Sequence, residues 1–307
     1  MIVYEPNKHF LKDIGHLAKS WTMVKIMRWV FAMGIYAAIV TFLVLHFDPE
    51  STMKMDATVF SFLGIVLSIL LVFKTNNSYD RWWEGRNQWG RLVNDCRNLA
   101  VVIQTSFPKE NKESRHLIAK HISNFCIGLK EHLRSGVKIE ELIYLTDQDK
   151  EIYATKAHIP NHISVQIHEV VYDVYRQKGI TGEDHLNIKT HTQALLEILG
   201  ACERIKKTPI PFSYAVFIKI FITVYAVLLP LAMVSSFGWW TIPVVMLIFF
   251  AFIGIEMLAE EIEDPFGLDC NDLPTGTIAH TIKENVFEIL EQKKGHENKA
   301  ELYAKIF

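Results

Sequence analysis

The segment from Ala57 to Gly90 constrains the fold of this chain more than any other. Residues 57–73 carry no ionisable side chain, and about 17 apolar residues are the least that a helix needs to cross the hydrocarbon core of a bilayer. Basic residues and tryptophans follow at once, in KTNNSYDRWWEGRNQWG. Such an ending is typical of a membrane helix that leaves the bilayer on the cytoplasmic side. The segment therefore predicts an integral membrane protein.

Three further apolar runs complete a set of four predicted spans, at about 26–45, 57–73, 214–234 and 239–255. The last two are separated by SSFGWW at residues 235–240, a turn signal with interfacial tryptophans. Lysine and arginine are dense before the first span and after the second, and sparse in between. The positive-inside rule therefore predicts that both termini are cytoplasmic.

The remaining sequence predicts helices outside the membrane. Residues 77–210 hold no further span and show apolar stripes at helical spacing, so we expect a helical cytosolic insertion. Residues 257–291 form an acidic loop and a last amphipathic helix, starting at about Thr277, and 292–307 is a polar tail. Strand-like alternation is absent, and the predicted class is all-α.

Composition excludes several functions. A net charge of −2 gives no reason to expect nucleic acid as a partner. The four cysteines have no metal-type spacing and are expected to be free thiols. No phosphate-binding or hydrolase motif occurs, so we predict neither an enzyme nor a bound cofactor. His158 and His162 are four apart, but Pro160 lies between them and argues against a zinc site there.

One face of the 57–73 span is a candidate functional surface. Ile65, Ile69 and Phe73 are spaced four apart and stack along one stripe of the helix. Such a stripe can pack against lipid or another helix, or it can line a narrow apolar pore built from several copies. Periodicity alone leaves both interpretations open.

Three sequence blocks resemble the bestrophin family of ion channels. They are LGIVLSILLVF with the following NNSYDRWWEGRNQWG, then CERIKKTPIPFSY at Cys202–Tyr214, and LAEEIEDPFGLDCNDLP at Leu258–Pro274. The blocks stand in family order, and the resemblance extends over residues 1–291. The Ile, Ile, Phe order of the stripe is similar to the bacterial branch, whereas animal members more often carry Ile, Phe, Phe.

The resemblance implies a homopentamer in the bacterial inner membrane. Five copies of Ile65, Ile69 and Phe73 would form the pore throat, and small monovalent ions would pass through it, chloride by family default. The implied partners are the lipid bilayer, other copies of the chain and the permeant ions.

The acidic loop has two interpretations. Its carboxylates either form a solvated turn or supply oxygen ligands for a cation such as calcium, from Glu261, Asp264, Asp269 and Asp272. In animal bestrophins the matching run is a calcium clasp that controls gating. Here Leu268 and Cys270 interrupt the run, so we expect calcium regulation to be weak or absent.

Counting back without gaps from the CERIKKTPIPF block, the resemblance places the family's cytosolic aperture at Glu183. A carboxylate ring there would attract cations, which makes a sodium- or potassium-selective channel the alternative to a chloride channel. Glu183 can equally be a helix N-terminal residue stabilised by the helix dipole. From other classes, a four-span secondary transporter and a membrane-tethered sensor remain open.

Overall fold

The computed structural model describes residues 20–47 and 56–292, and every regular element in these ranges is a helix, which confirms the all-α class. Two short 3₁₀ helices are η1 (Ile139–Glu141) and η2 (Gly238–Trp240). The α-helices are α2 (Trp21–Phe47), α3 (Ala57–Ser106), α4 (Lys112–His132), α5 (Asp147–Ala154), α6 (Ile159–Arg176), α7 (Gly182–Lys207), α8 (Phe212–Phe237), α9 (Thr241–Glu263) and α10 (Thr275–Ile289).

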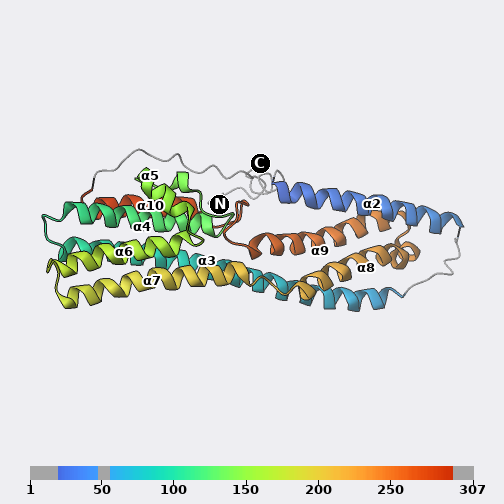
Figure 1. The fold of residues 1–307 in the computed structure, drawn as a ribbon. Coiled ribbons are helices and arrows are strands. Elements are labelled where there is room, and N and C mark those ends of the chain that lie inside the picture. The colour runs from blue at the N-terminus through green and yellow to red at the C-terminus, as the bar shows by residue number, and fades with distance from the viewer. Residues whose placement is uncertain (1–19, 48–55, 293–307) are drawn as a thin grey trace, which may run out of the picture.

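The longest element, α3, runs through both halves of the elongated molecule (Figure 1). Its 50 residues span about 75 Å at the usual helical rise. The Asp56 side chain caps its start by accepting from the Thr58 backbone N–H at 2.8 Å. It ends at Ser106, and Phe107 precedes Pro108, where proline disfavours helix. The sequence analysis treated 57–73 and the polar stretch after it as separate parts; one helix joins them because no proline interrupts it.

In one half of the molecule, α8 and α9 pack on the first part of α3, and α2 packs on α9 and α8 (Figure 1). The shared core is apolar and includes Leu67 and Leu71 of α3, Ile222 and Leu229 of α8, and Val245 of α9. Many large apolar side chains on the outside of the same helices are exposed, such as Phe31 and Ile35 of α2. An apolar exterior around an apolar core is what a lipid environment favours.

Three helical stretches in the described ranges are long and apolar enough to cross a membrane: Trp21–Phe47, Thr58–Ser106 and Gly182–Glu263. The third stretch contains α7, α8 and α9, and α8 and α9 are separate helices that pack side by side. The first three predicted spans fall within α2, α3 and α8, and the fourth, 239–255, begins in η2 and continues in α9.

In the other half, the second part of α3 packs with α4, α6, α7 and α10 around a second core (Figure 1). Trp89 of α3 is completely buried at its centre. The stripes that the sequence analysis singled out in this region are buried here, among them Ile122 of α4, Ile167 of α6 and Leu195 of α7. Each of these helices therefore buries one face in a common core.

Two helix boundaries in the structure differ from those predicted from the sequence. The turn between the last two apolar helices was expected to begin at residue 235, but Ser235 and Ser236 are helical and the chain turns at Gly238. Gly238 has φ of 51°, a conformation that glycine adopts without steric cost. The last helix starts at Thr275 rather than Thr277. The predicted polar tail lies outside the described residues from position 293 onward, as do 1–19 and 48–55.

Candidate functional site

An exposed apolar band covers one face of the first part of α3. Ile65, Ile69 and Phe73 are 57%, 51% and 58% exposed in the single subunit. The opposite face, with Leu67 and Leu71, is buried in the core shared with α8 and α9. The predicted throat residues therefore face away from the subunit's own core and are available to line a pore or to contact lipid or another subunit.

The band is wider than the predicted stripe and has a sharp end. Phe62, Val66 and Val72 are exposed beside it, so exposure alone does not separate pore lining from lipid contact. The Ser68 hydroxyl does not add a polar group to the band, since it donates within the helix to the Gly64 carbonyl at 2.8 Å. After Phe73 the positions that continue this face of α3 are polar, namely Asn76, Asn77 and Asp80, while Tyr79 and Trp83 are exposed beside them.

A buried ion pair lies next to the end of the band. Lys74 Nζ of α3 is 2.7 Å from Glu256 Oε1 of α9, and the two side chains are only 1% and 2% exposed. Lys219 of α8 approaches the same carboxylate at 3.7 Å and pairs with Glu260 at 2.9 Å. Sequence reasoning missed the Lys74–Glu256 pair because its members lie far apart in the chain and only the packing of α3 on α9 brings them together.

Arg81 of α3 joins the ends of two other helices. Its guanidinium donates to the Glu263 carbonyl at 3.0 Å and to the Ile205 carbonyl at 2.6 Å, and also to the carbonyl of Thr208. These carbonyls belong to the last turns of α9 and α7, where helices leave acceptors unsatisfied. The basic residue in the DRWW block therefore anchors both helix ends to α3.

The acidic loop after α9 contains a buried carboxylate. Asp272 is 1% exposed, and its Oδ2 accepts from the Asp269 backbone N–H at 2.5 Å. Its Oδ1 is buried without a protein partner among the described residues. Burial raises the pKa of Asp272 to about 7; the Asp269 hydrogen bond opposes this, and the charges of Asp269, Asp264 and Glu261 add to it.

The other predicted cation ligands are engaged with protein groups. Glu261 accepts from the Thr22 hydroxyl at 2.6 Å and from the Asn271 amide at 3.0 Å. Asp264 forms an ion pair with Lys206 of α7. The loop packs against α3 at Gly85, where an added Cβ would lie 3.1 Å from Pro265. Trp82 also fixes the loop by donating to the Asn271 carbonyl at 2.9 Å.

The predicted acidic loop from residue 257 begins later, because α9 continues to Glu263 and contains Glu261. The carboxylate of Glu261 and those of the three loop residues do not converge on one point. Within the described residues, no three ligand atoms of Glu261, Asp264, Asp269 and Asp272 lie within 4.8 Å of one another. Calcium needs several oxygen ligands around a single centre. The calcium site stays a prediction, and the present side-chain arrangement serves to hold the loop against α2, α3 and α7.

Comparison with known proteins identifies the chain. A family profile described as Bacterial/Fungal Bestrophin protein matches residues 1–288. The chain belongs to the bestrophin family. Bestrophins are ion channels and not enzymes, so membership confirms both the resemblance to the bacterial branch and the expectation that no enzyme chemistry resides here.

Curated relatives and solved structures agree with this assignment. A voltage-dependent anion channel-forming protein of Nostoc sp. is 35% identical over 288 residues, 92% of each chain. One of Mesorhizobium japonicum is 30% identical over 94% of this bestrophin and 92% of its own length. The crystal structure of a bacterial bestrophin homolog from Klebsiella pneumoniae matches with a TM-score of 0.81 at 26% identity, over 88% of this chain and 100% of that one.

The predicted cytosolic aperture residue of this bestrophin lies far from the apolar band. Glu183 is exposed in the first turn of α7, next to Asp184 and close to the end of α3, where the Ser106 hydroxyl donates to Asp184 at 3.2 Å. The Thr181 side chain and Asp184 form a capping box at this helix start. Asp184 thus completes the cap, and Glu183 is not needed for it. The position of Glu183 at a pore axis stays a prediction.

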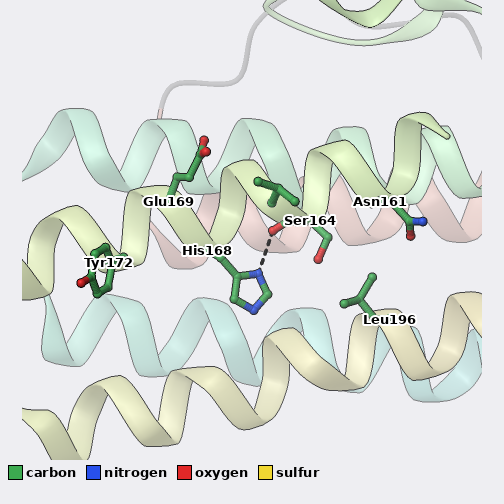
Figure 2. Close-up of a pocket in the computed structure, with 7 residues that line it drawn as sticks. Asn161, Ser164, His168, Glu169, Tyr172 and Leu196 are labelled. Atoms are coloured by element: carbon green, nitrogen blue, oxygen red, sulfur yellow. Dashed lines mark hydrogen bonds between the residues drawn. The ribbon is translucent and has the colours of Figure 1, made fainter. Parts of the chain in front are cut away.

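A groove of about 620 Å³ opens between α6 and α7 (Figure 2). The His168 ring ties the two helices together: Nδ1 donates to the Ser164 carbonyl at 2.8 Å, and Nε2 lies 3.0 Å from the Thr192 hydroxyl. Both ring nitrogens therefore have partners, and the groove offers mostly apolar lining. The lining residues are Asn161, Ser164, Val165, His168, Glu169, Tyr172 and Leu196.

Proposed function

We propose that this bestrophin assembles as a homopentamer and forms a channel for small monovalent anions, with chloride as the physiological ion. Ile65, Ile69 and Phe73 of five subunits form the throat. The observation that carries the proposal is the exposure of this stripe on α3, on the face turned away from the subunit core. The names of the relatives, which describe anion channel-forming proteins, support the sign of the ion.

In this proposal the four apolar helical segments at about 26–45, 57–73, 214–234 and 239–255 span the plasma membrane, with both termini in the cytoplasm. The first part of α3 crosses the bilayer, and its second part continues into the cytosolic helices of 77–210. Lipid surrounds the exposed apolar faces of α2, α8 and α9. The channel domain is 1–291, in which 257–291 supplies the acidic loop and α10, and 292–307 is a tail.

Conduction through such a throat is passive. Rings of isoleucine and phenylalanine carry no fixed charge, so an ion that enters them loses part of its hydration without a charged partner. A narrow apolar passage of this kind controls flow by wetting and dewetting. Selectivity for the sign of the ion then depends on charged rings elsewhere on the axis.

A cation-selective channel of the same fold is the second candidate. It is favoured by Glu183, an exposed carboxylate at the start of α7, at the end of the molecule away from the apolar band. If five copies face the axis, their negative charge attracts cations and repels anions. The two candidates share the throat and differ only in which ion carries the current.

Two experiments test the proposal. Native mass measurement of the detergent-purified protein is expected to give five subunits, and a species no larger than a dimer would contradict the pore. Bilayer recording in a salt gradient is expected to show unitary currents whose reversal potential lies towards that of chloride. Unitary currents also separate a channel from the two other classes, a secondary transporter and a membrane-tethered sensor.

A further inference from the structure

Two histidines and a glutamate meet where the end of α4, the start of α6 and the last part of α7 come together. His132 Nε2 lies 2.6 Å from Glu203 Oε1, and His158 Nε2 lies 2.8 Å from the same oxygen. The two imidazole rings are 4.4 Å apart between centroids. His132 is the last residue of α4, His158 caps the start of α6, and Glu203 belongs to the penultimate turn of α7. Two imidazoles thus converge on one carboxylate oxygen.

Within the described residues, this is the one group of three histidine, cysteine or acidic residues whose ligand atoms all lie within 4.8 Å of one another. Neither the acidic loop nor the groove between α6 and α7 provides such a group. The cluster is also reachable from solvent, because its side chains are 21% to 30% exposed. An ion can therefore enter, and a water molecule can complete its coordination.

The arrangement of the cluster suits a cation. Glu203 Oε1 faces Nε2 of both His132 and His158, so an ion placed among these atoms meets one carboxylate oxygen and two imidazole nitrogens. Lys207 is 3.5 Å from the second carboxylate oxygen but 70% exposed, so its side chain can turn away into solvent.

We propose that His132, His158 and Glu203 bind a zinc-like divalent transition-metal ion, with water as the fourth ligand. Two imidazole nitrogens and one carboxylate oxygen are a ligand set that zinc takes in proteins when it keeps an open position. Imidazole favours zinc and its neighbours among the transition metals, whereas calcium and magnesium prefer oxygen ligands alone.

The geometry needs only small side-chain shifts to accept the ion. Zinc bonds of about 2.0–2.1 Å at tetrahedral angles place two ligand atoms about 3.3 Å apart. The present separations from Glu203 Oε1, 2.6 and 2.8 Å, therefore have to widen by about 0.5–0.7 Å. His158 Nδ1 now accepts from the Asn161 backbone N–H at 3.2 Å. Binding through Nε2 moves the ring proton to Nδ1 and gives up this long hydrogen bond.

Neighbouring ligand types do not compete for the ion. Cys202 precedes Glu203, but its side chain is buried on the core face of α7 and is not part of the cluster. His162, four positions after His158, is not part of the cluster. The sequence spacing of His158 and His162 therefore gave no sign of the site, because the other two ligands, His132 and Glu203, come from α4 and α7.

The test is metal binding by the full-length protein in detergent, measured without any conduction assay. Zn²⁺ titration by calorimetry is expected to saturate at one ion per subunit, and Co²⁺ is expected to give the visible d–d bands of four-coordinate cobalt. Ca²⁺ and Mg²⁺ serve as control ions and are expected to give no saturable signal at this site. A bound ion also links α4, α6 and α7, so Zn²⁺ at 100 times its Kd is expected to raise Tm by about 5 °C.

Matched variants decide the assignment. Glu203→Gln and His132→Gln each keep a hydrogen-bonding side chain but remove one ligand, and each is expected to weaken Zn²⁺ binding at least about 100-fold. His162→Gln is the control and is expected to bind as wild type does. Thermal melting in the presence of EDTA reports whether each variant folds. One folded variant of the two is enough to test the assignment. Wild-type protein that does not saturate with Zn²⁺, or folded variants that bind it unchanged, would overturn the proposal.

Discussion

Phe73 and Lys74 are adjacent on α3 and lie in opposite environments: the Phe73 side chain is 58% exposed, and that of Lys74 is 1% exposed. Lys74 faces α9, where its ammonium meets Glu256 at 2.7 Å. Consecutive residues on a helix point about 100° apart. The buried ion pair therefore fixes the rotation of α3 about its own axis, and this rotation directs the Ile65, Ile69 and Phe73 stripe away from the subunit core.

Removing one member of this pair is expected to be costly. Glu256→Leu leaves the Lys74 ammonium buried without its main partner, which typically destabilises a protein by about 3–5 kcal/mol. The double variant Lys74→Met with Glu256→Leu removes both charges and is expected to recover most of that loss. Thermal melting of the purified variants measures both effects.

The neighbouring exposed pair provides the control. Lys219 and Glu260 are 45% and 54% exposed, and breaking an ion pair of this kind changes stability by about 0–1 kcal/mol. Glu260→Gln should therefore melt close to wild type. If Glu256→Leu also melts like wild type, the buried pair does not hold α3 in place.

The next prediction concerns the free-energy barrier that the apolar throat presents to ions. Phe73→Ala or Ile69→Ala removes a large apolar side chain from the proposed constriction and is expected to raise unitary conductance or open probability, because a wider and wetter throat has a lower dewetting barrier. Phe31 of α2 is also 58% exposed, so Phe31→Ala is a control of equal size and exposure. Single-channel recording compares the three variants. Unchanged currents in Phe73→Ala and Ile69→Ala, with normal assembly, would move the pore lining to another helix.

Acid stability is expected to depend on His121 of α4. This side chain is 5% exposed, and its Nδ1 is buried without a hydrogen-bond partner in the described part of the chain. Burial lowers the pKa of His121 to about 4, the Lys120 ammonium adds to this, and Asp149 opposes it. An unfolded histidine titrates near pH 6.5. The folded state therefore binds fewer protons between these values, and stability is lost as pH falls through this window.

The size of this effect is on the order of 3 kcal/mol between pH 6.5 and pH 4. His121→Leu is expected to flatten this part of the dependence of Tm on pH. The same substitution at His280, which is exposed on α10, is the control for losing a histidine. An equal slope in wild type and His121→Leu would show that this ring does not limit stability in acid.

Features that depend on nearby residues were open to prediction from the sequence. Composition and helical period indicate the apolar runs, the stripes on α4, α6 and α7 that are buried, and the stripe on α3 that is exposed. These features are set by residues that are close together in the chain. The continuity of α3 was missed although its signal was present. The change from apolar to polar residues at Lys74 marks a change of surroundings, and only a proline or a helix cap would mark an end.

Features that depend on tertiary packing were not open to prediction. Lys74 meets Glu256 across 182 positions, and Arg81 reaches the ends of α7 and α9 across more than 120. The cluster of His132, His158 and Glu203 has the same origin. No period or motif relates these residues, because their distances are set by how whole helices pack and not by their local spacing.

Calcium is expected to have little effect on the channel. Glu261 already accepts hydrogen bonds from Thr22 and Asn271, and Asp264 forms an ion pair with Lys206. Calcium would have to displace these partners. We therefore expect open probability in bilayers to be the same with micromolar calcium and with a chelator. Opening by calcium that is abolished in Asp269→Ala would instead establish a functional cation site in this loop.

The names of the relatives and one residue of this chain favour opposite signs of the permeant ion: the names favour an anion, and Glu183 favours a cation. Rings of Ile65, Ile69 and Phe73 supply no fixed charge, so selectivity has to arise elsewhere on the axis. Glu183 is exposed at the start of α7 and has no role in the capping box that Thr181 and Asp184 form. Its carboxylate interacts favourably with the dipole of α7 and is also accessible to ions.

If five copies of Glu183 face the axis, Glu183→Gln is expected to move the reversal potential in a salt gradient towards that of chloride, or to reduce the cation current, without changing assembly. Glu151→Gln on α5 removes the same charge from another exposed position and is the control. A wild type that is already strongly chloride-selective, with no shift in Glu183→Gln, would place this residue away from the pore. That result would favour the anion channel, with the apolar throat as its constriction, over the cation channel.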